Sequence, residues 1–148
     1  MKKILFTALL LGAFVLESQA QKKYKIITTI ESIVPGGLGR SRIIENTQEI
    51  DAAQFTTQRA DGKDSKQGDV KRSDAKIDAL NETKILNFFS MTGINFQNIA
   101  SNDAMITSIL NSLSEQGWEL FTVVSGVESD AGKDDGNGVF ITRYVFRK

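Results

Sequence analysis

Apolar residues recur along this chain at two spacings, and the spacings indicate where strands and helices form. From Tyr24 to Ser32 the segment YKIITTIES is rich in β-branched residues and meets no breaker until Pro35, which predicts a strand. Alternation divides this strand into two faces: Tyr24, Ile26, Thr28 and Ile30 form one, and Lys23, Lys25, Ile27, Thr29 and Glu31 form the other. Because the second set carries all the charge, we expect it to be the wetter face.

A turn and a second strand follow the first. Residues 34–39, VPGGLG, supply turn residues, and residues 40–50, RSRIIENTQEI, predict a strand that pairs with the first in a hairpin-like arrangement. Between Phe55 and Ile77 the chain is almost entirely polar and carries charges of both signs. Such a segment buries too little apolar surface to offset the entropy of ordering it. We therefore expect residues 56–76 to form a mobile polar excursion from a single domain.

The next elements are a short strand and a long helix. Residues 83–90, TKILNFFS, favour a strand over a short helix, because they include two aromatic residues and Gly93 soon ends the run. From residue 101 the spacing becomes helical, with Ser101 or Asn102 as the expected N-cap and Asp103 in the first turn. An apolar stripe follows, consisting of Met105, Ile106, Ile109, Leu110 and Leu113. Gly117 is expected to end the helix in a left-handed conformation.

Two further strands close the chain. Residues 118–129, WELFTVVSGVES, and residues 139–148, VFITRYVFRK, read as strands joined by the loop DAGKDDGNG. In the last strand one face consists of Phe140, Thr142, Tyr144 and Phe146, and we expect it to pack against the helix stripe. The predicted class is α+β, with an antiparallel sheet of about four strands and one main helix packed on one face.

Three segments together resemble a small bacterial family, the domain of unknown function 4177. They are Tyr24–Ile27, the helix end running into residues 113–120 (LSEQGWEL), and the closing residues 144–148 (YVFRK). The family reads YKVV, then a helix ending EGWELV, then a strand ending FKR. The resemblance implies a compact strand, helix, strand, strand unit with no assigned catalytic residues. It covers about a third of the chain, and residues 34 to about 100 are an insertion relative to the family.

Trp118, the single tryptophan, admits a structural and a functional interpretation. A large aromatic residue directly after a helix end, with Leu120 two positions later, is placed to close the end of the core, where an indole buries about 150–250 Å². The alternative is a residue that stacks on a ligand. The structural interpretation is favoured, because tryptophans are highly buried on average.

The first twenty residues have the pattern of a secretory signal peptide. Lys2 and Lys3 precede an uncharged run from Ile4 to Leu16, whose thirteen residues would form a helix of only about 20 Å. That length is short for a membrane span, and a buried N-terminal helix is the remaining alternative. We expect cleavage near Ala20, leaving residues 21–148 as an exported single domain, periplasmic or secreted. Because the chain has no cysteine, it forms no disulfide and carries no lipid on a cysteine.

Composition restricts both partners and chemistry. Eighteen basic and eighteen acidic residues balance, so nothing indicates attraction to nucleic acid or to an anionic membrane. Without histidine and cysteine, nucleophile systems built on these residues and the usual zinc sites are impossible. Ser73 and Lys76 fit the S-x-x-K pattern of lysine-activated serine, but they lie in the polar excursion rather than at the start of a buried helix. We predict no catalytic residue, no cofactor and no enzyme.

Two loops are candidates for binding small ions. Residues 128–138 place Asp130, Asp134 and Asp135 close together in a glycine-containing loop, and oxygen ligands of this kind suit calcium, although the EF-hand spacing is absent. Residues 36–42, GGLGRSR, place Arg40 and Arg42 beside three glycines, where backbone amides and guanidinium groups suit a small anion. An ordinary solvated hairpin loop and a turn followed by an edge strand are the respective alternatives.

These observations rank three functions. The first is a non-enzymatic module that binds another protein or an envelope component, as favoured by the export pattern, the small complete core and the lack of catalytic side chains. The second is binding of calcium or a small anion through the two loops. An enzyme ranks third.

Overall fold

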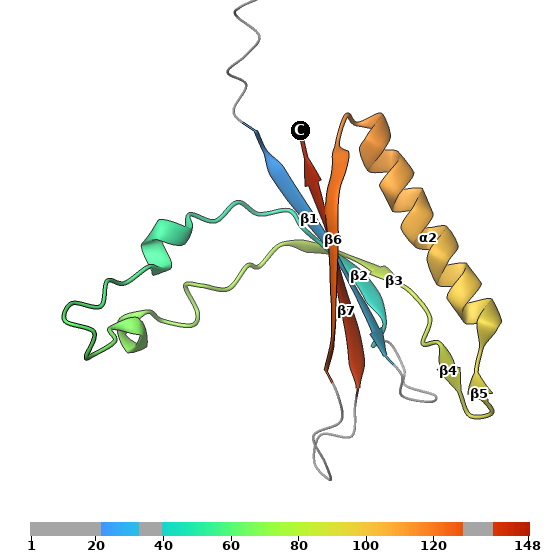
Figure 1. Cartoon of the computed structure of the whole chain (residues 1–148), viewed down its shortest axis with the longest axis horizontal. Coiled ribbons are helices and arrows are strands. Elements are labelled where there is room, and N and C mark those ends of the chain that lie inside the picture. Colours follow the sequence, from blue (N-terminus) through green and yellow to red (C-terminus); the bar gives the residue numbers. More distant parts are fainter. Residues whose placement is uncertain (1–21, 33–39, 129–137) are drawn as a thin grey trace, which may run out of the picture.

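The computed structural model of the chain describes residues 22–32, 40–128 and 138–148. Its main feature is a five-stranded antiparallel sheet in the order β3-β2-β1-β7-β6 (Figure 1). The strands are β1 (Tyr24–Ser32), β2 (Arg42–Asn46), β3 (Leu80–Lys84), β6 (Glu119–Glu128) and β7 (Val139–Arg147). The short strands β4 (Phe89–Ser90) and β5 (Gly93–Ile94) form a separate pair, and α2 (Phe96–Glu115) is the long helix. The α+β class is confirmed, but the sheet has five strands rather than about four.

Helix α2 begins earlier than the sequence pattern indicates. Its N-cap is Asn95, whose side chain accepts a hydrogen bond from the Asn98 amide at 3.1 Å. The prediction of Ser101 or Asn102 as the N-cap was wrong, because both lie inside the helix. Asn102 is buried and its side chain bonds the backbone of Leu86, so it fixes a tertiary contact instead of a helix end.

The end of α2 follows the prediction. Gly117 has φ +83°, a left-handed conformation that costs glycine little. The Gly117 amide donates to the Ser114 carbonyl at 2.8 Å, and the Trp118 amide donates to the Leu113 carbonyl at 3.0 Å. These two bonds form a Schellman motif, which satisfies carbonyls at the helix end and turns the chain directly into β6.

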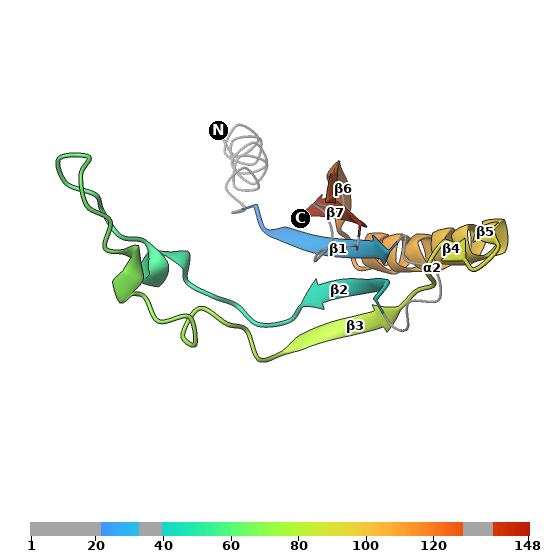
Figure 2. The same ribbon diagram turned by 90° about the horizontal axis from the view of Figure 1, so that it is seen from below.

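The core lies between α2 and one face of the sheet (Figure 2). Its buried residues are Ile27, Ile43, Ile85, Leu113 and Phe146, and the partly buried residues packed against them are Met105, Ile106, Ile109, Leu110, Trp118 and Tyr144. The predicted helix stripe is therefore confirmed, and so is the predicted covering face of the last strand at Tyr144 and Phe146, whereas Phe140 on the same face is 40 % exposed. The indole of Trp118 packs at the edge of this core, with the Lys25 ammonium 5.6 Å from its ring centroid.

The two faces of β1 are reversed relative to the prediction. Ile27 and Thr29 are 3 % and 1 % exposed beneath α2, whereas Tyr24 and Ile26 are 59 % and 48 % exposed. The face expected to be wetter is the one that forms the core. Its charged residues mislead the pattern because they are paired: Lys25 bonds Glu45, and Glu31 accepts from Asn102.

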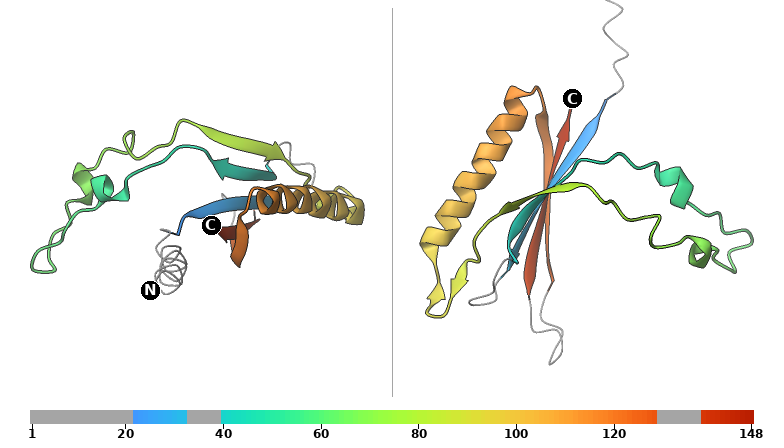
Figure 3. Two further views of the ribbon diagram at one scale, coloured as in Figure 1. Left: turned by 90° about the horizontal axis from the view of Figure 1, so that it is seen from above. Right: turned by 180° about the vertical axis from the view of Figure 1, so that it is seen from behind.

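Residues 47–79 form an arm that leaves the sheet on the side opposite α2 (Figures 1 and 3). It contains the short 3₁₀ helices η2 (Ala52–Phe55) and η3 (Gln67–Asp69). The Gln67 side-chain amide links its two branches by donating to the Phe55 carbonyl and the Thr57 hydroxyl. The predicted excursion lies within this arm. The strand expected over residues 83–90 is divided into the end of β3 and β4, because Ile85 enters the core between them.

Three expectations fall wholly or partly outside the described residues. They are the signal peptide over residues 1–20, the glycines at 36, 37 and 39, and the acidic loop residues Asp130, Asp134 and Asp135. In the part of the chain that the structure describes, no helix is long and apolar enough to cross a membrane.

Candidate functional site

A groove of about 500 Å³ runs between α2 and the strands β2 and β3. Core residues including Ile27, Ile43 and Leu113 form its floor. Polar residues line its rim, namely Glu45, Asn81, Glu82, Thr83, Ser112 and Gln116. The volume suits a small molecule, so the groove is one candidate site.

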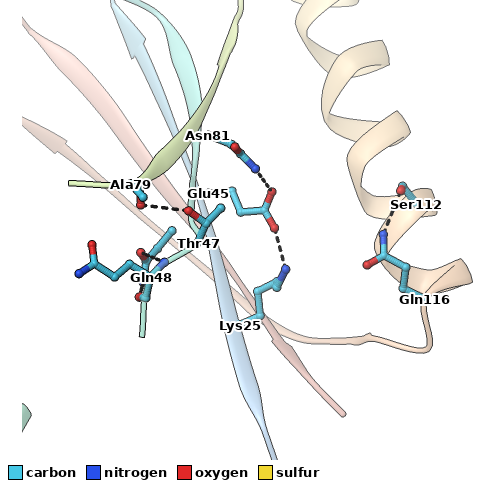
Figure 4. Close-up of polar contacts among 9 residues, drawn as sticks. Lys25, Glu45, Thr47, Gln48, Ala79, Asn81, Ser112 and Gln116 are labelled. Atoms are coloured by element: carbon cyan, nitrogen blue, oxygen red, sulfur yellow. Dashed lines mark hydrogen bonds and ion pairs between the residues drawn. The ribbon is translucent and has the colours of Figure 1, made fainter. Parts of the chain in front are cut away.

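Several polar groups of the groove already bond one another. The Lys25 ammonium, itself outside the lining, lies 2.6 Å from one Glu45 oxygen, and the Asn81 amide donates to the other at 3.3 Å (Figure 4). The Lys25 contact lowers the pKa of the Glu45 carboxyl, although partial burial acts in the opposite direction. The Gln116 amide donates to the Ser112 hydroxyl on the helix side of the groove. A ligand would have to displace these contacts, which makes the groove a weak recognition site.

The second candidate is the sheet face turned away from α2, which we call the open face. Cross-strand pairing places these residues on it: Tyr24, Ile26, Thr28 and Ile30 of β1, Ile141, Arg143, Val145 and Arg147 of β7, Thr122 and Val124 of β6, and Ile44 of β2. No described helix covers this face (Figure 3). Apolar side chains, several of them large, share this face with charged ones, because the same pairing also places Arg42, Glu82, Lys84, Glu119 and Glu128 on it.

The aromatic residues of the open face gather near one end of it. The rings of Tyr24 and Phe121 meet edge to face at a centroid distance of 6.2 Å, and the Arg147 guanidinium lies 4.9 Å from the Phe121 ring centroid. Phe121 reaches this face at the irregularity in pairing between Leu120 and Thr122. Phe121 and Val124 are 52 % and 58 % exposed, so these apolar groups are in water.

Arg143 lies at the midpoint of β7 on the open face, paired with Thr28 of β1 on one side and Val124 of the edge strand β6 on the other. Its side chain is exposed, and it forms no ion pair with any described residue. The other arginines of this sheet differ. Arg147 donates twice to the Glu119 carboxylate, both at 2.9 Å, and Arg42 donates to Glu82 at 2.7 Å. Arg143 is therefore an exposed cation with Ile141 and Val145 as its neighbours along the strand. None of the described carboxylates forms an ion pair with it.

The edge of the sheet beside the open face is also exposed. All ten residues of β6 are exposed, and the eight from Leu120 to Val127 carry no charge. The opposite edge, β3, has five residues that include Glu82 and Lys84. Charged and short edge strands resist pairing with other chains, whereas long uncharged ones do not. The exposed apolar surface thus extends from the open face to the β6 edge.

The residues weighed for ion binding or catalysis that lie in the described part of the chain do not form a site there. Arg42 is paired with Glu82, while Arg40 is exposed beside it without an ion pair to a described residue. The Ser73 hydroxyl donates to Asp74 at 2.9 Å in the exposed arm. Within residues 22–32, 40–128 and 138–148, no three acidic residues lie close enough together to hold a metal ion.

No protein-family model, curated protein or solved structure matches this chain. The resemblance to a bacterial family of unknown function thus remains a prediction. Sequence reasoning missed Arg143 as a candidate residue. The sequence contains a signal that could have identified it. Arg143 alternates with Ile141 and Val145 on the face of the last strand that is opposite the residues expected to pack against the helix.

Proposed function

We propose that this protein is an exported, non-enzymatic module that binds another protein or an envelope component through the open face. One observation carries the proposal: Tyr24 and Ile26, on the most regularly apolar face of β1, are exposed, while Ile27 and Thr29, on the face with charges, are buried against α2. Monomeric proteins rarely expose contiguous apolar patches above a few hundred Å², and larger patches usually mark interaction surfaces.

The composition of the open face also supports binding of a macromolecule. Interface centres are enriched in tyrosine, phenylalanine and arginine and depleted in lysine and acidic residues. The open face has Tyr24, Phe121, Arg143 and Arg147 among aliphatic side chains. It is the pleated surface of a sheet, and an extended surface of this kind favours a large partner over a small molecule.

Export and family membership belong to the same proposal. The N-terminal charge and apolar run support export, and the GWEL helix end with the YKII strand supports kinship with the bacterial family of unknown function. The absence of histidine and cysteine supports a binding function over catalysis, because the commonest acid–base and nucleophilic groups are missing.

A binding assay with surface variants tests the proposal. The tagged chain is incubated with envelope extract of its source cells, and bound material is quantified for wild type, Val124→Ser and Ile26→Ser. Ser108→Ala on the exposed side of α2 serves as the matched control. We expect both open-face variants to lose bound material while the control retains it. Equal recovery from all four proteins, each shown to be folded by circular dichroism, contradicts the proposal.

A further inference from the structure

We infer that the open face binds a partner protein that presents a carboxylate within an apolar surface, with Arg143 as the central contact. This inference deepens the proposed function and depends on it. It specifies the chemistry of the partner and the residue that recognises it.

The position of Arg143 makes it the anchor. Glu82, Ile44, Thr28, Arg143 and Val124 form a row across β3, β2, β1, β7 and β6, so Arg143 has three strands on one side and the edge strand β6 on the other. Along β7 its neighbours on the same face are Ile141 and Val145. A partner that covers the apolar residues therefore also covers Arg143. Residues at the centre of an interface are the ones that contribute most to binding.

The missing carboxylate determines what the partner must provide. Removing an unpaired guanidinium from water is costly, whereas a bidentate pair with a carboxylate offsets that loss. Arg147 and Arg42 already have such partners in Glu119 and Glu82, but Arg143 has none among the described residues. A purely apolar partner would leave this charge buried and unpaired. The partner therefore supplies an aspartate or a glutamate opposite Arg143.

The same charge argues against a second copy of this chain on the open face. In a twofold dimer each patch meets its own copy, so two open faces packed centre to centre would bring the two Arg143 side chains together. Like charges in a desolvated interface repel strongly. An anionic membrane is also disfavoured, because such surfaces attract clusters of four to eight basic residues. Two of the arginines on the open face, Arg42 and Arg147, are already paired with glutamates.

Site-specific photocrosslinking tests the inference in the source cells. A photoreactive amino acid replaces Thr28, which lies directly beside Arg143, and a second protein carries it at Gln97, an exposed position on α2. Crosslinked peptides are identified by mass spectrometry. We expect the Thr28 position to capture a protein segment that contains an acidic residue among apolar ones, and the Gln97 position to capture far less of it.

Affinity measurements with the purified partner then test the ion pair. We expect Arg143→Glu to weaken binding by a factor of about 30 or more, the size of effect typical of interface hot spots. Reversal of the partner's acidic residue to lysine should restore most of the lost affinity in the Arg143→Glu background. Arg143→Lys should fall between wild type and Arg143→Glu, because lysine keeps the charge but loses the bidentate geometry.

Each other outcome has a defined meaning. Capture of a partner from the Gln97 position alone, self-crosslinked dimers, or crosslinks to lipid overturns the inference. Unchanged affinity of Arg143→Glu for a partner captured at Thr28 overturns it as well, although the proposed function survives that result. Absence of any crosslink at either position contradicts the proposed function itself.

Discussion

Replacement of Asn102 by alanine should cause a large loss in the free energy of unfolding for a single substitution. Asn102 is 1 % exposed inside α2, and its carboxamide makes three bonds outside the helix. The oxygen accepts from the Leu86 amide at 2.8 Å, and the nitrogen donates to the Leu86 carbonyl at 2.7 Å and to Glu31 at 3.1 Å. One side chain thus holds the chain between β3 and β4 against the helix and links both to β1.

The size of the effect follows from what alanine leaves behind. The amide and the carbonyl of Leu86 each lose a partner, and a buried polar group without a partner costs about 1–3 kcal/mol. Leu86 is only half-buried, so water reaches it in part, and we expect a total loss of about 2–4 kcal/mol in the free energy of unfolding. Small domains are stable by about 5–15 kcal/mol, so the change is easily measured by urea denaturation.

The neighbouring residue provides the control. The Ser101 hydroxyl donates to the Gln97 carbonyl within the same helix at 2.8 Å and does not bond to the sheet. Ser101→Ala should change stability by less than about 0.5 kcal/mol, as is usual for substitutions away from the core. If Asn102→Ala is as stable as Ser101→Ala, the bridge between α2 and Leu86 does not hold the fold together.

Three further substitutions test the core, the helix end and the ion pair. Phe146→Ala removes the most deeply buried large side chain and should cost about 3–5 kcal/mol in urea denaturation, whereas Phe121→Ala on the open face should cost far less. Gly117→Ala should lower stability by about 1–2 kcal/mol because alanine is strained at the positive φ of this position. A steric clash does not contribute, because the added methyl group meets only the Lys148 side chain, at an ordinary contact distance of 3.5 Å. Because the pKa of Glu45 is lowered in the folded protein, the Glu45 carboxylate of the unfolded chain takes up its proton at a higher pH than that of the folded chain. Its stabilising effect is therefore present above the ordinary carboxyl pKa of 4.5 and disappears as pH falls through the folded value. Glu45→Gln should remove this part of the acid dependence, about 0.2–1 kcal/mol for a partly exposed pair, as measured by thermal melts between neutral and acidic pH; an identical acid slope in the variant contradicts the role of the pair.

Local patterns predicted the elements whose signals are local. The strand at Tyr24–Ser32 and the helix end at Gly117 follow from β-branched residues and from the conformational freedom of glycine. The start of α2 was missed because Asn102 resembles an N-cap in sequence, while its side chain serves a contact sixteen residues away in the chain. No local rule distinguishes these two uses of an asparagine.

The uncovered face of β1 could not be predicted because it depends on which side of this strand the helix covers. Counting charges pointed to the wrong side, since Lys25 and Glu31 are accommodated at the ends of the covered face by Glu45 and Asn102. Those partners come from β2 and α2 and are brought to β1 only by the fold. Alternation along the last strand already separates Arg143 from the helix-facing residues, but only the pairing of β7 with β1 and β6 shows which residues surround it.

Thiol labelling of two adjacent residues tests the central claim, that α2 covers one face of the sheet and leaves the apolar face of β1 bare. The chain has no cysteine, so Ile26→Cys and Ile27→Cys each introduce a single thiol. In the folded protein we expect the thiol at residue 26, now 48 % exposed, to react with a maleimide at nearly the rate of the unfolded chain. The thiol at residue 27, now 3 % exposed, should be protected until the protein unfolds. Fast labelling at residue 27 together with protection at residue 26 would mean that the helix lies on the other face and that no open face exists.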